Sequence, residues 1–199
     1  GDAVADRIGP VWGLDEQGEL RNMWRPTPQP GLWFLAGSLA QCRIYSKVLA
    51  LQIKAREGGH HSGNWGGILS DPAIQLAHAI ASITSPTGQI RIHEWVPKEL
   101  PDGVRRALAD CEIDGGPDGP TIDPNWGEPG LSPAEQVFGW CSFDVLAMKS
   151  GVPETPVNAV PPSAWARCQL RFVVGTDAGD VVPALRRHLA RHGFPMVEV

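Results

Sequence analysis

Apolar and polar residues alternate in two stretches of the chain, and each stretch predicts a strand with one buried face. In residues 45–54 the apolar positions are every second residue of the later half: Leu49, Leu51 and Ile53. In residues 165–174 five alternate positions are apolar: Ala166, Cys168, Leu170, Phe172 and Val174. Arg171 lies on the opposite, polar face of this second strand.

Apolar residues recur at helical spacing in two other stretches. Residues 70–83 carry an apolar stripe, with Ser70 expected as the N-cap and Pro72 in the first turn: Ala73, Leu76, Ala77, Ile80 and Ile83. Residues 180–193 carry a second stripe: Val181, Leu185, Leu189 and His192. Gly193 is expected to end this helix as its C-cap.

Shorter signals complete the series of elements. We expect strands at 89–95, 142–150 and 194–199, a short helix at about 101–111 and a helical turn at 132–140. Residues 1–44, rich in proline near their end, are predicted to be an irregular N-terminal segment or linker. Residues 45–199 are predicted to form one domain, with a Gly/Pro/Asp-rich loop insertion at about 112–132.

The order of elements predicts the fold class. It reads β-α-β, an insertion, then β-β-α-β, and the strands alternate rather than being apolar throughout. Such strands need helices on one face only. We therefore predict an α+β, two-layer sandwich with a mainly antiparallel sheet and two main helices on one face.

Composition excludes several classes of function. The net charge of −5 provides no basic stripe, so neither nucleic acid nor a membrane surface is an expected partner. No apolar run approaches the ~20 residues that span a bilayer, and the first residues do not form a secretion signal. The four cysteines match no CxxC pattern, and we expect free thiols in the cytoplasm.

The glycine-rich loop "GGHHSGNWGG", residues 58–67, is the first candidate for chemistry. His60 and His61 are adjacent and should point to opposite sides, so a shared metal is not expected; a zinc site also needs about three protein ligands. Ser62 lacks a G-x-S-x-G elbow. His188 and His192 have the i, i+4 spacing of a chelating pair, but the favoured interpretation is a solvated or C-terminal pair that complements the helix dipole.

Two further residues have both a structural and a functional interpretation. Arg171 is either a surface arginine paired with an acidic residue or a bidentate clamp for a carboxylate. Asn158, in "PVNAVPP", is either a turn residue or an amide donor to a substrate oxygen. The residues by themselves do not assemble a complete active site.

Two segments resemble the M20 family of metallopeptidases. "IKAREGGHHSGNWGG", followed by a helix starting "DPAIQLAHAIASI", resembles the family's H-S-G-x-x-G-G segment. "PVNAVPPSAWARCQLRFVVGTDAGDVVPALRRHL" resembles its N-x-I-P-x-x-x-x-A-x-x-x-x-R segment and the helix that follows. The resemblance covers residues 47–95 and 138–199, and it implies the ferredoxin-like lid, or dimerisation, domain of the dipeptidase and carnosinase-like branch.

The resemblance also implies roles for single residues. His61 would stabilise the oxyanion in the active site of the other subunit. Arg171 would bind the free carboxylate of a peptide or amide substrate, Asn158 would touch the substrate near the scissile group, and Gly63 would allow close approach. His60 receives no role.

The same resemblance implies what lies outside the chain. Two zinc ions would be held in a separate catalytic domain by an H-x-D motif and a Glu-Glu pair, and the chain contains neither motif. The chain is therefore expected to hold no metal and to be inactive alone. A homodimer would form through the lid's edge strand and its first long helix, at about 71–84.

Two alternatives from other classes remain open. One is a free-standing α/β protein-interaction module in which the histidines have no catalytic role. The other, the less favoured, is an autonomous metal hydrolase built on His60, His61, His188 or His192. An H-x-D and Glu-Glu region encoded upstream separates the lid from the interaction module, and stoichiometric zinc in the purified chain would support the hydrolase.

Overall fold

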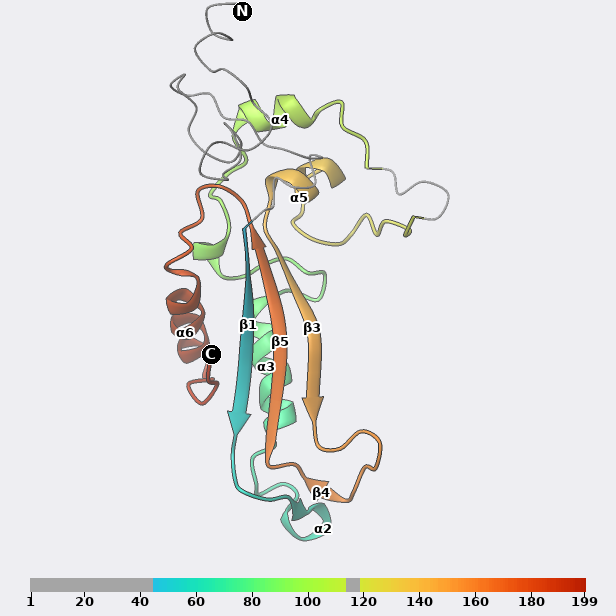
Figure 1. Ribbon diagram of the computed structural model, residues 1–199, viewed down its shortest axis with the longest axis vertical. Helices are drawn as coiled ribbons and strands as arrows, with labels where there is room; N and C mark the ends of the chain where they lie inside the picture. The colour runs from blue at the N-terminus through green and yellow to red at the C-terminus, as the bar shows by residue number, and fades with distance from the viewer. Residues whose placement is uncertain (1–44, 114–118) are drawn as a thin grey trace, which may run out of the picture. The chain divides into compact units, whose positions relative to one another are not determined.

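The computed structural model describes residues 45–113 and 119–199 (Figure 1), and the fold below concerns these residues. The predicted N-terminal segment, residues 1–44, and positions 114–118 of the predicted insertion lie outside the described residues.

The main sheet has three antiparallel strands. They are β1 (Tyr45–Lys54), β3 (Ser142–Ser150) and β5 (Ser163–Phe172), in the spatial order β1-β5-β3. A second, two-stranded sheet pairs β2 (His60–His61) with β4 (Ala159–Val160). Figure 1 shows β4 beyond the end of the main sheet at which β1 finishes and β5 begins.

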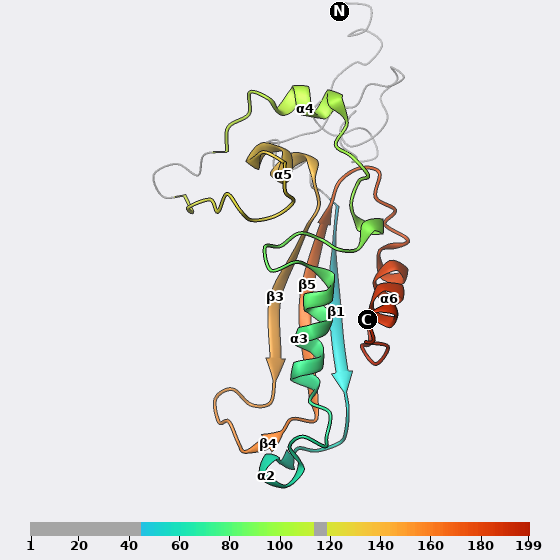
Figure 2. The same ribbon diagram turned by 180° about the vertical axis from the view of Figure 1, so that it is seen from behind.

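Two longer helices cover one face of the main sheet. They are α3 (Pro72–Ile83) and α6 (Val181–Arg191). Figure 2 shows α3 lying across the sheet and α6 alongside β1. The shorter helices are α2 (Ser62–Trp65), the 3-10 helix η2 (His93–Trp95), α4 (Asp102–Leu108) and α5 (Pro133–Gly139). The predicted α+β two-layer sandwich is confirmed.

The core lies between the sheet and these two helices. Alternate residues of β1 and β5 enter it, which confirms the predicted strand faces: Leu49, Leu51, Ile53, Ala166, Cys168, Leu170 and Phe172. The prediction for Val174 is wrong. Its side chain is 81% exposed, because β5 ends at Phe172 and the chain then turns.

The start of α3 differs from the prediction by one residue. Asp71, not Ser70, is the N-cap, and its Oδ1 accepts hydrogen bonds from the backbone N–H groups of Ala73 (2.8 Å) and Ile74 (3.4 Å). A carboxylate satisfies these unpaired donors and also faces the positive end of the helix dipole. At the end of α6, Gly193 has the positive φ expected of a C-cap glycine.

Two predicted strands are absent. Residues 89–95 form an isolated bridge at Ile90 and then the 3-10 helix η2. Their apolar alternation reflects burial in the core: Trp95 is fully buried, and its Nε1–H donates to the carbonyl oxygen of Val181 (2.9 Å) at the start of α6. Residues 194–199 form no strand and contribute a single bridge, from Glu198 to Gln52.

The two edges of the main sheet differ. At the β1 edge, the backbone of Glu198 exchanges hydrogen bonds with that of Gln52 (2.9 and 2.8 Å). With this segment counted as a fourth strand, the spatial order is that of a ferredoxin-like βαββαβ unit. At the β3 edge, no further strand pairs within the described residues. Three large apolar side chains of β3 are about half exposed: Val145, Leu146 and Met148.

Candidate functional site

The loop that carries His61 is fixed to the segment that carries Asn158. His61 lies opposite Ala159 in the β2–β4 pair. The next residue, Ser62, donates its backbone N–H to the carbonyl oxygen of Asn158 (2.9 Å). The structure therefore brings His61 and Asn158 together, although about a hundred residues separate them in sequence. Both residues are exposed.

Arg56 contributes to this arrangement, and sequence reasoning missed it. Its Nη1 donates to the carbonyl oxygen of Pro161 (3.0 Å), and its Nη2 donates to the carbonyl oxygen of Ser70. Its backbone N–H reaches the carbonyl oxygen of Pro162 (3.3 Å). One half-buried arginine thus ties both sides of the glycine-rich loop to the turn before β5. The only signal in the sequence was a cation two residues before that loop.

The imidazole of His61 caps its own short helix. Its Nδ1 accepts a hydrogen bond from the backbone N–H of Gly63 (3.1 Å) at the start of α2. A Cβ atom on Gly63 would lie 3.0 Å from Cε1 and 3.1 Å from Nδ1 of this ring. Gly63 therefore contacts His61 itself, and its backbone donor is already engaged.

His60 has a different neighbour. Its ring lies edge-on to the indole of Trp65, with centroids 6.0 Å apart and planes inclined by 63°. The two adjacent histidines thus engage different groups, and no shared metal site follows from their adjacency.

Arg171 lies at the opposite end of the main sheet. It pairs with Ser46 and Ser142, whereas β5 begins near β4 at Ser163. The eight residue steps from Ser163 to Arg171 correspond to about 26 Å at the usual rise of a strand. The structure therefore does not bring Arg171 to His61 and Asn158.

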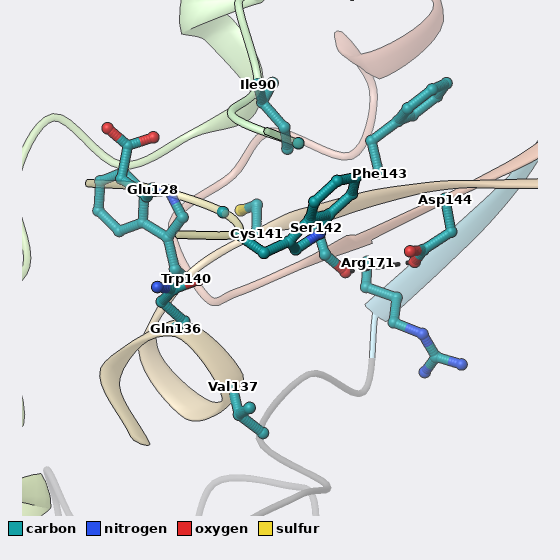
Figure 3. A pocket seen from close by; sticks show the side chains of 13 residues that line it. Ile90, Glu128, Gln136, Val137, Trp140, Cys141, Ser142, Phe143, Asp144 and Arg171 are labelled. Atoms are coloured by element: carbon teal, nitrogen blue, oxygen red, sulfur yellow. Dashed lines mark hydrogen bonds between the residues drawn. The ribbon is translucent and has the colours of Figure 1, made fainter. Parts of the chain in front are cut away.

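The surroundings of Arg171 leave its guanidinium exposed. Among the described residues it forms no ion pair, so the expected alternative of a paired surface arginine has no support there. The residue borders a pocket of about 290 Å³ whose other walls include Trp126, Trp140 and Asp144. Figure 3 shows the guanidinium extending past Asp144, on the side of the pocket away from Glu128. An exposed guanidinium of this kind has all its donors available to a carboxylate.

His188, near the end of α6, belongs to the core, so the expected solvated pair is wrong for this residue. His188 is 3% exposed, and its Nε2 lies 2.9 Å from the carbonyl oxygen of Ser82 on α3. His192, which was expected on the buried stripe, is exposed and stacks on His188 with centroids 4.2 Å apart. Burial lowers the pKa of His188, and its hydrogen bond to the backbone carbonyl of Ser82 acts in the opposite direction.

The described residues do not fit a zinc site. Within 45–113 and 119–199, no group of three or more His, Cys, Asp or Glu side chains is placed to hold a metal ion. Cys168 is fully buried, and burial raises the pKa of its thiol to about 11, so it packs as a small apolar side chain. No helix in the same part of the chain is long and apolar enough to cross a membrane.

Comparison with known proteins gives matches at the level of structure. No sequence-family model matches the chain, and no curated protein does. The M20 family metallo-carboxypeptidase Sso-CP2 from Sulfolobus solfataricus aligns with a TM-score of 0.58 and 21% identity, over 75% of this chain and 36% of its own. The dipeptidase Dug1p from Saccharomyces cerevisiae aligns with a TM-score of 0.56 and 16% identity, over 73% and 32%.

Human carnosine dipeptidase 1 gives the same result, with a TM-score of 0.58 and 18% identity over 73% of this chain and 32% of its own. The chain therefore has the fold of a part of M20 family peptidases, as the resemblance of its motifs predicted. It spans about a third of the length of each of these proteins.

Proposed function

We propose that this chain is the substrate-binding and dimerisation lid of an M20-type peptidase that hydrolyses peptides or related amides. The observation that carries the proposal is the placement of His61. An exposed imidazole is held on a glycine-rich loop whose backbone is fixed to Asn158, on a fold that M20 peptidases share.

His61 would act as a hydrogen-bond donor to the oxyanion that forms when the scissile carbonyl is attacked. A donor fixed in place before the reaction lowers the barrier because it needs no reorganisation as charge develops. One such donor typically contributes about 3 kcal/mol. Asn158, beside His61, would contact the substrate near the scissile group.

The distance between His61 and Arg171 supports the use of His61 in trans. A dipeptide extends only about 7 Å, whereas the length of β5 that separates the two ends is about 26 Å. One copy of this domain therefore does not place both residues on the same small substrate. Arg171 would bind a terminal carboxylate in one active site, and His61 would serve the active site of the partner.

The β3 edge supports the proposed homodimer. No further strand of the described residues pairs with this edge, and its half-exposed apolar side chains suit contact with a second copy across a two-fold axis. On α3, which packs against the same sheet, Ile74 is 60% exposed. The β1 edge is less suitable because Glu198 already bonds to it.

The two zinc ions of such an enzyme would be held by the catalytic domain. The described residues of this chain lack a fitting ligand set, so no catalytic step through the metal is assigned to them. The isolated chain is expected to be inactive.

The coding sequence that flanks this chain provides the first test. It should encode an H-x-D motif and a Glu-Glu pair; a reading frame without them would favour the free-standing interaction module. In the intact protein, His61→Ala should lower peptide turnover by about 100-fold or more and leave the zinc content unchanged. Loss of zinc would show that His61 is a ligand, and unchanged turnover would remove its role altogether.

A further inference from the structure

We infer that Gly63 is a positioning residue that holds His61 in the Nε2–H tautomer, so that the loop presents a hydrogen-bond donor. The inference concerns the protonation of one ring. It rests on the proposed function only for the identity of the atom that accepts the hydrogen bond from Nε2 of His61, which would be the oxyanion of the substrate.

The tautomer follows from the contact between the two residues. A neutral imidazole has one N–H donor and one acceptor nitrogen. The backbone nitrogen of Gly63 can only donate, and it lies 3.1 Å from Nδ1 of His61. Nδ1 must therefore supply the lone pair, and the ring proton resides on Nε2.

The backbone on both sides of the ring is fixed, which gives the donor a direction. His61 pairs with Ala159, Ser62 donates to Asn158, and α2 is closed by a 2.7 Å hydrogen bond from the N–H of Gly66 to the carbonyl oxygen of Ser62. With the backbone held, only the side-chain torsions of His61 remain free. The contact with Gly63 restricts them.

A side chain at position 63 would press on the ring of His61. A Cβ there would lie 3.0 Å from Cε1 of His61, closer than ordinary van der Waals contact, so the ring would shift relative to the N–H that orients it. Gly58, in the same loop, is a matched control, because a Cβ on Gly58 would have no heavy atom within 4 Å.

The tautomer determines what the loop can do. A neutral His61 with its proton on Nε2 donates from that atom, and it offers no lone pair there to a metal ion or to a proton of the substrate. The partner of His61 is therefore a hydrogen-bond acceptor. A general base or a metal ligand that used Nε2 would require the opposite tautomer.

The test is nitrogen-15 NMR of the imidazole in the full chain, recorded over a series of pH values up to the mildly alkaline range. His61→Gln assigns the signals. In the unaltered chain, Nδ1 should have a pyridine-like shift and Nε2 a pyrrole-like shift. A pyrrole-like Nδ1 would overturn the inference without any substitution.

Two variants test the role of Gly63. Gly63→Ala should move both ring shifts toward the average of the two tautomers, whereas Gly58→Ala should leave them unchanged; amide spectra report whether each variant is folded. Unchanged shifts in a folded Gly63→Ala chain would refute the positioning role. The proposed function fails separately, if the intact protein hydrolyses peptides equally well without His61 while the tautomer is as inferred.

Discussion

His188 and Ser82 connect the two helices that cover the sheet. Nε2 of His188, on α6, lies 2.9 Å from the carbonyl oxygen of Ser82, on α3, and the ring is almost completely buried. A neutral ring with its proton on Nε2 satisfies this carbonyl. A charged ring would have to remain in the core beside His192 and Arg191, with Glu94 as the opposing acidic neighbour.

The pH dependence of stability follows from this burial. The pKa of His188 is lowered from the ordinary value of 6.5, so the unfolded chain binds the proton more readily than the folded chain. The contribution of His188 is therefore present above pH 6.5 and is lost as the pH falls below it. Urea unfolding at a series of pH values should show the loss. His188→Gln, whose amide can still donate to the carbonyl of Ser82, should reduce the change in the free energy of unfolding with pH. His192→Gln should retain most of this pH dependence.

Trp95 should be a major determinant of stability. It fills the core between the helices and donates from Nε1 to Val181. Trp95→Phe keeps most of the apolar surface but leaves that carbonyl without its donor and opens a small cavity, so the free energy of unfolding should fall by about 1–3 kcal/mol. Trp165→Phe, at an exposed position, should change it by less than about 0.5 kcal/mol. Equal effects in denaturant titrations would contradict the role given to Trp95.

Arg171 should determine the preference for substrates with a free carboxylate. In the intact protein, Arg171→Lys should chiefly raise KM, because lysine cannot form the bidentate fork of a guanidinium. Arg167 is four residues earlier on the same exposed face of β5, so Arg167→Lys is the matched control and should have little effect. If Arg171→Lys raises KM equally for carboxyl-amidated substrates, Arg171 does not bind the carboxylate.

The β3 edge should carry the dimer contact of the intact protein. Leu146→Lys places a charge on an exposed apolar position of that edge and should shift the protein toward monomer in sedimentation velocity experiments. Val48→Lys, at an exposed position of β1, should leave the dimer unchanged. If Val48→Lys dissociates the dimer and Leu146→Lys does not, the interface lies at the β1 edge instead.

The local pattern predicted the main strands and helices well, because each buries one face and that face repeats with the period of the element. The β1 strand has the predicted bounds, and β5 and α6 differ by a few residues. The errors occurred where the apolar pattern had more than one structural solution. Residues 89–95 alternate like a strand, but they bury Ile90, Ile92 and Trp95 in the core without pairing as one.

The sequence by itself determined the fold class, since this depends on the periodicity of apolar residues, and the resemblance of two of its segments to the M20 family proposed His61, Asn158 and Arg171 as site residues. Only the tertiary structure decided which of them lie together, because strand pairing joins positions that are far apart in sequence. It placed Asn158 beside His61 and Arg171 at the far end of β5. It also placed the N–H of Gly63 on His61 and the ring of His188 in the core, two contacts that depend on backbone geometry and on packing between helices.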